Sequence, residues 1–175
     1  MDLRNIPKPS EGEYVPYTIM YIGLLPDDGK VLQHLQDNLT KTIAFARSFS
    51  EEQLIRPCAE GEWTIKEILV HIIDDERIYG YRALRYARND STALPGFEQD
   101  EYVPYSNANG RSLDSILAEL TAVRQATITL FNSFDDEALT RKGIGSGNIM
   151  SVRAAAYHIA GHELHHINSI KENYL

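Results

Sequence analysis

The chain has 175 residues, of which 43% are hydrophobic and 24% are charged, a composition typical of a globular protein rather than of a disordered chain. This length allows one domain to bury most of its apolar surface without disulfides, and we predict a single domain over residues 1–175. The net charge of −8 argues against a nucleic-acid partner, because phosphate binding requires clustered Lys and Arg.

The single cysteine, Cys58, excludes an internal disulfide framework and fits a reducing compartment. The longest apolar run, residues 17–25, is too short to cross a bilayer. Glu11 and Glu13 precede this run, where a secretory signal would have basic residues. We therefore expect a cytoplasmic protein that does not insert into membranes.

Two long helices are predicted in the first half of the chain, after an N-terminal stretch that contains four prolines. The first covers about residues 29–49, where apolar residues recur at intervals of three and four. A short helical turn follows at residues 50–53. The second long helix begins at residues 64–67 (TIKE), which have the pattern of a capping box, and continues to about Arg88.

Two more long helices are predicted in the second half. Residues 89–110, which contain several Pro, Gly and Asn, read as a long connection. A third helix over about residues 113–133 has Ser112 as its N-cap. Glycines within residues 143–147 indicate a flexible turn, and Ser151 caps a final helix that runs nearly to the last residue. The four helices predict an all-α four-helix bundle.

Four arginines follow one another along the second predicted helix, which also carries acidic residues. The arginines are Arg77, Arg82, Arg85 and Arg88, and the acids are Asp74, Asp75 and Glu76. We interpret this pattern as a solvated, salt-bridged helix face rather than a phosphate-binding surface.

Four of the six histidines fall in the final predicted helix: His158, His162, His165 and His166. At ~100° per residue, His162 and His166 lie toward the apolar stripe, whereas His158 and His165 point toward solvent or the helix flank. Two imidazoles one turn apart can bind one metal ion, and this spacing recurs in zinc sites. The simpler alternative is two ordinary helix histidines, one of them hydrogen-bonded in the core.

The sequence His162-Glu163-x-x-His166 also has the form of a zinc-peptidase motif. Those enzymes need a further protein ligand after the helix, but nothing breaks the helix here and only nine residues follow His166. A third ligand must therefore come from earlier in the chain. His71, about two turns into the second predicted helix, is the favoured candidate, with a partly buried structural histidine as the alternative; His34 is expected at the surface.

Three neutral imidazoles with an open position form a catalytic type of metal site. Zinc and nickel suit these ligands, and iron and manganese are compatible with them. Glu163 and Glu76 fall on the apolar sides of their helices, where a carboxylate is unusual unless it is paired or functional. Each is a candidate general base or an acceptor that orients a ligand histidine. The alternative is a buried ion pair with an arginine such as Arg82 or Arg124.

Several segments of the chain resemble the DinB/YfiT-like superfamily. They are Trp63–His71 (WTIKEILVH), the Asp74-x-Glu76-Arg77 pattern and Ala160–His166 (AGHELHH), with shorter similarities at residues 12–14, 81–85 and 94–97. The resemblance spans nearly the whole chain. It implies a four-helix bundle, often a homodimer, in which a divalent metal is held by three histidines at positions 71, 162 and 166.

The resemblance also bears on function. Characterised members include S-transferases and an isomerase that depend on low-molecular-weight thiols, and others are described as metal-dependent hydrolases. We therefore expect a metal-dependent transferase of the thiol S-transferase type, or a hydrolase, that acts on a small molecule. The alternative is a non-enzymatic metal-binding or stress-associated binding module with a vestigial site.

Overall fold

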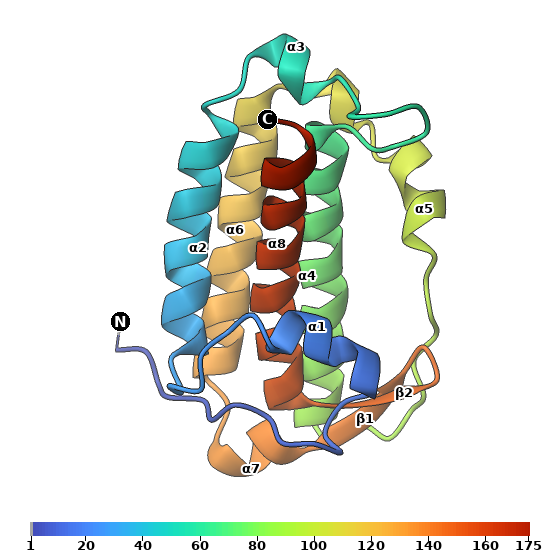
Figure 1. Ribbon diagram of the computed structural model, residues 1–175. Helices are drawn as coiled ribbons and strands as arrows, with labels where there is room; N and C mark the ends of the chain where they lie inside the picture. Colours follow the sequence, from blue (N-terminus) through green and yellow to red (C-terminus); the bar gives the residue numbers. More distant parts are fainter. Residues whose placement is uncertain (1) are drawn as a thin grey trace.

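The computed structural model describes residues 2–175 and has the expected four-helix bundle (Figure 1). The long helices are α2 (Val31–Ala46), α4 (Ile65–Ala87), α6 (Leu113–Asn132) and α8 (Val152–Asn173). Their bounds agree with the predicted ranges to within a few residues. Within residues 2–175, no helix is both long enough and apolar enough to cross a membrane.

Short elements precede the first long helix and connect the long helices. They are η1 (Pro16–Thr18), α1 (Ile19–Ile22), α3 (Glu51–Leu54), α5 (Gln99–Tyr102), η2 (Val103–Tyr105), η3 (Ala108–Gly110), α7 (Asp136–Thr140), β1 (Lys142–Gly145) and β2 (Asn148–Ser151). The predicted helical turn after α2 is α3. The predicted connection between α4 and α6 contains α5, η2 and η3, and Figure 1 shows α5 on the outside of the bundle, apart from the long helices.

The glycine-rich segment that the sequence predicts as a flexible turn is an antiparallel hairpin. β1 pairs with β2 in a register that places Gly145 opposite Asn148. The two turn residues, Ser146 and Gly147, have φ angles of 53° and 74°, and a tight two-residue hairpin turn requires such positive values. Each strand has only four residues, too few to give a clear hydrophobic alternation in the sequence.

Side-chain caps explain where three of the long helices begin. The Glu67 amide donates to the Thr64 hydroxyl, and the Thr64 amide donates to the Glu67 carboxylate at 2.7 Å, which confirms the capping box at the start of α4. Ser112 and Ser151 cap α6 and α8, each accepting from the amide three residues later. Such caps satisfy amides that have no partner inside the helix.

One buried guanidinium links all four long helices. Arg124 on α6 is fully buried, and its Nε and Nη2 donate to the Glu76 carboxylate on α4 at 2.9–3.1 Å. Its Nη1 donates to the Leu35 carbonyl on α2 at 2.6 Å, and its Nη2 lies 2.9 Å from Oε2 of Glu163 on α8. Thr42 donates to the other Glu163 oxygen at 2.7 Å. The bundle interior therefore has a polar centre in which two buried carboxylates share one guanidinium, which offsets the cost of burying them.

The N-terminal segment covers part of α8. The backbone amide of Ser151 donates to the Glu13 carbonyl at 2.8 Å, and the Glu13 carboxylate accepts from Ser151 Oγ and from Arg153. Further along α8, a Cβ atom at Gly161 would lie 2.1 Å from the Tyr21 carbonyl oxygen, so α1 packs directly on the α8 backbone. As Figure 1 shows, α1 crosses α8, which is thus covered by α1 as well as by α2 and α4.

Candidate metal centre

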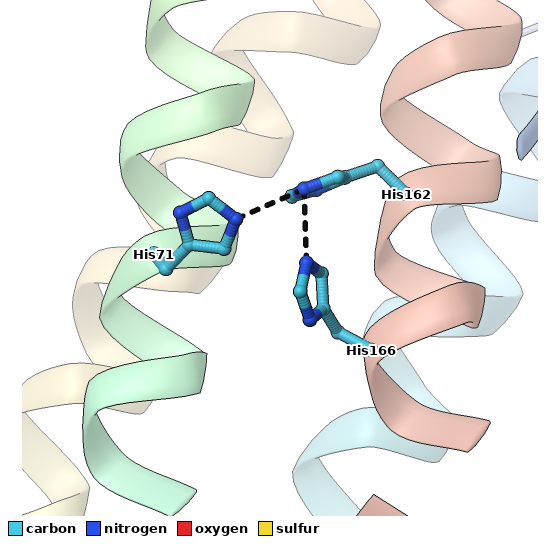
Figure 2. A group of neighbouring side chains, drawn as sticks. All are labelled: His71, His162 and His166. Carbon is cyan, nitrogen blue, oxygen red and sulfur yellow. Dashed lines mark hydrogen bonds between the residues drawn. The ribbon is translucent and has the colours of Figure 1, made fainter. Parts of the chain in front are cut away.

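Three histidine side chains from two helices converge inside the bundle (Figure 2). The Nε2 atom of His162 lies 3.0 Å from Nε2 of His71 and 3.1 Å from Nε2 of His166. One ring nitrogen from each residue lies within 4.8 Å of the other two. The three residues that the sequence proposes as ligands are therefore neighbours in the structure.

Helix geometry explains why these side chains meet. His162 and His166 are one turn apart on α8, and residues at this spacing share a helix face. α4 packs along α8 and supplies His71 from the opposite side. The capped start of α4 lies two turns before His71, so the residue is held within a regular part of the helix.

Burial keeps the three imidazoles neutral. It lowers the pKa of His71 and His162 below the usual range and lowers the pKa of His166 to about 3, because the charged imidazolium is disfavoured away from water. A metal binds the neutral imidazole. At neutral pH these nitrogens are therefore already in the form that a metal ion requires.

A carboxylate that the sequence analysis assigned to a solvated helix face is instead buried beside the cluster. Asp75 follows His71 by one turn of α4, and its Oδ2 lies 3.4 Å from His162 Nδ1 and 3.2 Å from His158 Nε2. Burial disfavours the charged form of Asp75, but the neighbouring His162 and His158 outweigh this effect and hold its pKa below the usual range. A carboxylate beside Nδ1 keeps the proton on that atom and leaves the Nε2 lone pair free. The four-residue spacing from His71 is the sequence signal that could have revealed it.

The prediction that His158 points toward solvent or the helix flank is wrong. His158 is 2% exposed, and its ring stacks between the rings of Tyr79 and His162, at centroid distances of 3.7 Å and 5.5 Å. The apolar stripe of α8 indicated one buried face, but packing of α1 against α8 buries a further part of the helix. His165 is half-buried beside Tyr21 and is not part of the three-histidine cluster.

Glu76 and Glu163, the two candidate bases, are engaged in the polar centre of the bundle. Both carboxylates contact Arg124, and neither lines the cavity beside the histidines. Burial raises the pKa of Glu163, and Arg124 opposes this effect. The buried ion pair that the sequence left as an alternative is therefore the observed arrangement. Within residues 2–175, neither carboxylate has a hydrogen bond to a histidine. His34, expected at the surface, forms an ion pair with Asp28 away from the cluster.

The three histidines line a cavity of about 330 Å³, a volume near the lower end of the range for small-molecule sites. Tyr21, Trp63 and Tyr79 stand around the histidines. The farther walls come from residues 97–99 and from the hairpin between residues 145 and 150. One side of the cavity is therefore formed by the long helices, and the other side by connecting segments.

The donor set fits a transition-metal ion. Three Nε2 atoms face one another, and a single cation between them would satisfy the lone pairs of all three. Three imidazoles leave at least one coordination position for another ligand, as in catalytic sites. Imidazole nitrogen is a donor that suits zinc, nickel and iron.

Comparisons with known proteins agree with this fold. Residues 34–170 match the DinB superfamily, and the chain belongs to that superfamily. A protein of Oceanobacillus iheyensis named "putative metal-dependent hydrolase" is 26% identical over 144 residues, which cover 81% of this chain and 80% of the relative. A Bacillus licheniformis protein with the same designation is 27% identical over 129 residues, which cover 72% of this chain and 73% of the relative.

A solved structure shares the fold. YfiT from Bacillus subtilis, described as "a probable metal-dependent hydrolase with an unusual four-helix bundle topology", matches with a TM-score of 0.68 at 19% identity. The match covers 94% of this chain and 90% of the YfiT chain. At this identity the likeness concerns the fold, and it agrees with the bundle predicted from the sequence.

Proposed function

We propose that this protein binds a divalent transition metal through His71, His162 and His166 and is a metal-dependent thiol S-transferase or hydrolase acting on a small molecule. The observation that carries the proposal is the convergence of three neutral imidazoles at the wall of a cavity of about 330 Å³. A zinc or nickel ion bound there, or iron or manganese, would lower the pKa of a coordinated thiol or water and so supply a nucleophile.

The residues around the cluster have separate roles in this proposal. Asp75 keeps the proton of His162 on Nδ1 and so directs Nε2 toward the cavity. The Tyr21 ring stands edge-on to His158 and His162, with centroid distances of 5.0 Å and 5.3 Å, and shields that side from water. Burial raises the pKa of Tyr21 to about 12. Its hydroxyl is therefore neutral at physiological pH and acts as a hydrogen-bond donor rather than as a base.

Two lines of support bear on the reaction class. The relatives named metal-dependent hydrolases, at 26% and 27% identity, support metal-assisted chemistry. The thiol alternative rests on the resemblance of the chain to a superfamily that includes thiol-dependent S-transferases. The same resemblance leads us to propose a homodimer, for which the molar mass in solution from light scattering is the test.

Metal content tests the proposed site directly. Wild-type protein stripped with a chelator and then incubated with Zn²⁺ or Ni²⁺ should retain about one ion per chain by elemental analysis. His162→Ala should lose most of this metal, whereas the neighbouring His165→Ala should retain it and serves as the matched control. A wild type that retains no transition metal contradicts the proposal, and so does equal retention by His162→Ala.

Activity separates the two enzyme classes from a binding module. Metal-loaded protein is incubated with an aryl halide and several low-molecular-weight thiols, and separately with simple esters. Thiol-dependent loss of the halide, absent in His162→Ala, supports the transferase. Ester hydrolysis without thiol supports the hydrolase. Metal retention without turnover of either set would support a non-enzymatic metal-binding protein instead.

A further inference from the structure

Arg82 on α4 is a buried guanidinium without an acidic partner. The residue is 5% exposed, so it does not belong to the solvated helix face that the sequence predicts. Within residues 2–175, no carboxylate lies in ion-pair distance of it. Its Nη2 donates to the Pro95 carbonyl at 3.1 Å and to Ser146 Oγ at 2.7 Å, both of them neutral. Since a buried charge is costly without an opposite charge, this guanidinium needs an anion.

A second polar group points to the same place. Tyr86, one turn after Arg82, is 1% exposed, and its hydroxyl has no hydrogen-bond partner within residues 2–175. A Cβ atom at Gly145 would lie 2.7 Å from Tyr86 Oη and 2.9 Å from Arg82 Nε. Both donors therefore pack directly against the Gly145 backbone, where a larger residue would push them aside. Burial raises the pKa of Tyr86, so the hydroxyl keeps its proton and can donate it.

The charge of the cavity limits which anion fits. Arg82, Tyr86 and Gly145 line the cavity that the three histidines also line, and no other Arg or Lys of the described chain does so. Asp75 and Glu98 line it as well, so a second negative charge on the ligand would be repelled. A carboxylate carries one charge, and its two oxygens match the planar fork of a guanidinium. These features favour a carboxylate over a phosphate dianion.

We propose that the cavity binds a small organic acid whose carboxylate is held by Arg82 and Tyr86 and whose reactive end faces the histidine cluster. This inference rests on the proposed function and specifies the substrate class for the same cavity. Nothing in the sequence pattern pointed to it, because Arg82 and Tyr86 on α4 are covered by Pro95, Gly145 and Ser146, which are distant in the chain.

The cavity between Arg82 and the histidine cluster has room for a molecule of several bonds. The Arg82 guanidinium lies over the Tyr79 ring, 5.0 Å from its centroid, and Tyr79 stacks on His158, which stacks on His162. The rings of Tyr79, His158 and His162 form a continuous surface from Arg82 to the histidine cluster. Arg82 follows His71 by eleven residues on α4, about three turns, and its guanidinium reaches back over Tyr79. The reacting atom of the acid is therefore separated from its carboxylate by several bonds.

Calorimetric titration with hexanoate, hexanamide and inorganic phosphate tests the proposal. Hexanoate should bind the wild type at least about tenfold more tightly than hexanamide or phosphate. Arg82→Gln and Tyr86→Phe should each weaken hexanoate binding, the former by about tenfold or more. Arg85→Gln is the matched control, because Arg85 lies on the same helix but pairs with Asp90 outside the cavity; it should leave binding unchanged.

Gly145→Ala provides a variant that keeps both donors. Its methyl group would lie only 2.7 Å from Tyr86 Oη and 2.9 Å from Arg82 Nε, so it should displace both donors and abolish hexanoate binding. Gly80→Ala should not affect binding, since no atom lies within 4 Å of the added carbon. Arg82→Gln also loses contacts to Pro95 and Ser146, so circular dichroism and thermal unfolding check that each variant folds. If Arg82→Gln is unfolded, Gly145→Ala and Tyr86→Phe decide the outcome.

Several outcomes would overturn the proposal: no measurable hexanoate binding to the wild type, equal binding of hexanoate and hexanamide, or unchanged binding in folded Arg82→Gln or Gly145→Ala. The titrations are run on metal-free and Zn²⁺-loaded protein, and metal content is measured for every variant. Arg82-dependent hexanoate binding by a protein that retains no metal would contradict the proposed function but support the carboxylate site. Metal retention without hexanoate binding would overturn only the carboxylate site.

Discussion

The carboxylate of Asp75 on α4 lies beside the Nδ1 atom of His162 on α8, with 3.4 Å between Oδ2 and Nδ1. This contact joins the two helices that carry the candidate ligands and acts on the one histidine whose Nε2 contacts both of the others. We therefore expect Asp75→Asn to weaken Zn²⁺ affinity by about 10- to 100-fold, the usual cost of losing a partner that orients a metal ligand.

Competition against a fluorescent zinc chelator measures this affinity. Asp74→Asn is the matched control, because Asp74 is the adjacent acid on α4 and does not line the histidine cavity. An Asp75→Asn protein with wild-type zinc affinity would show that the carboxylate does not orient His162.

The buried histidines predict how the stability of the metal-free protein depends on pH. The unfolded chain binds protons at histidine below about pH 6.5, whereas burial lowers the pKa of His71 and His162, and that of His166 to about 3. Between these values the unfolded state binds more protons, so the free energy of unfolding falls as pH falls from about 6.5 toward about 3. His166 alone should account for a change on the order of a few kcal/mol over this window.

Urea denaturation of chelator-treated protein at about pH 7.5 and about pH 5 measures the effect, with the lower midpoint expected at the lower pH. His166→Gln should reduce the difference between the two midpoints, since one of the titrating groups is absent. Equal midpoints for the wild type at both pH values would contradict the expected direction.

Arg124 should be among the residues most costly to replace. Arg124→Met leaves the carboxylates of Glu76 and Glu163 buried without their cation, and such uncompensated charges typically destabilise a protein by about 3–5 kcal/mol. Equilibrium unfolding in urea gives the change. Arg47→Met is the control, because the Arg47–Asp114 pair is exposed and should contribute at most about 1 kcal/mol. Comparable effects of the two substitutions would argue against a structural role for the polar centre.

Two glycines in long helices should respond to alanine in opposite ways. At Gly161 on α8, the added Cβ would lie 2.1 Å from the Tyr21 carbonyl oxygen, and we expect a loss of about 1–3 kcal/mol from overpacking. At Gly80 on α4, no atom lies within 4 Å of the added carbon, so the better helix propensity of alanine should stabilise the protein by up to about 1 kcal/mol. Thermal unfolding of the two variants compares them, and a stabilised Gly161→Ala would contradict the close approach of α1.

The sequence was sufficient for the four long helices because their boundaries depend on local chemistry. The Thr64 cap and the apolar spacing act within one helix, and the structure confirms both. The spacing of His162 and His166 is local in the same sense. To predict that His71 lies near His162 and His166, it was enough to assume that the second and last long helices are neighbours. The short-range patterns and the family resemblance together supported that assumption.

The features that sequence analysis missed depend on contacts among three or more segments. His158 is buried between Tyr79 of α4 and Tyr21 of α1, and no periodicity within α8 contains that information. Arg82 was assigned to a solvated face because its burial comes from Pro95 and Ser146, which are distant in the chain. The pairing of Glu163 likewise depends on an arginine from another helix. The position of Glu163 on its own helix therefore could not distinguish a catalytic role from a structural one.

The cavity has two kinds of wall, and they can change independently during evolution or in the laboratory. The histidines and Asp75 belong to long helices tied into the bundle by Arg124, whereas the opposite walls belong to the hairpin and to residues 97–99. Substitutions, insertions or exchanges in these connecting segments would alter which molecules enter without disturbing the atoms that would hold the metal. The architecture is therefore suited to diversification, in which the three histidines stay in place while the shape of the cavity changes.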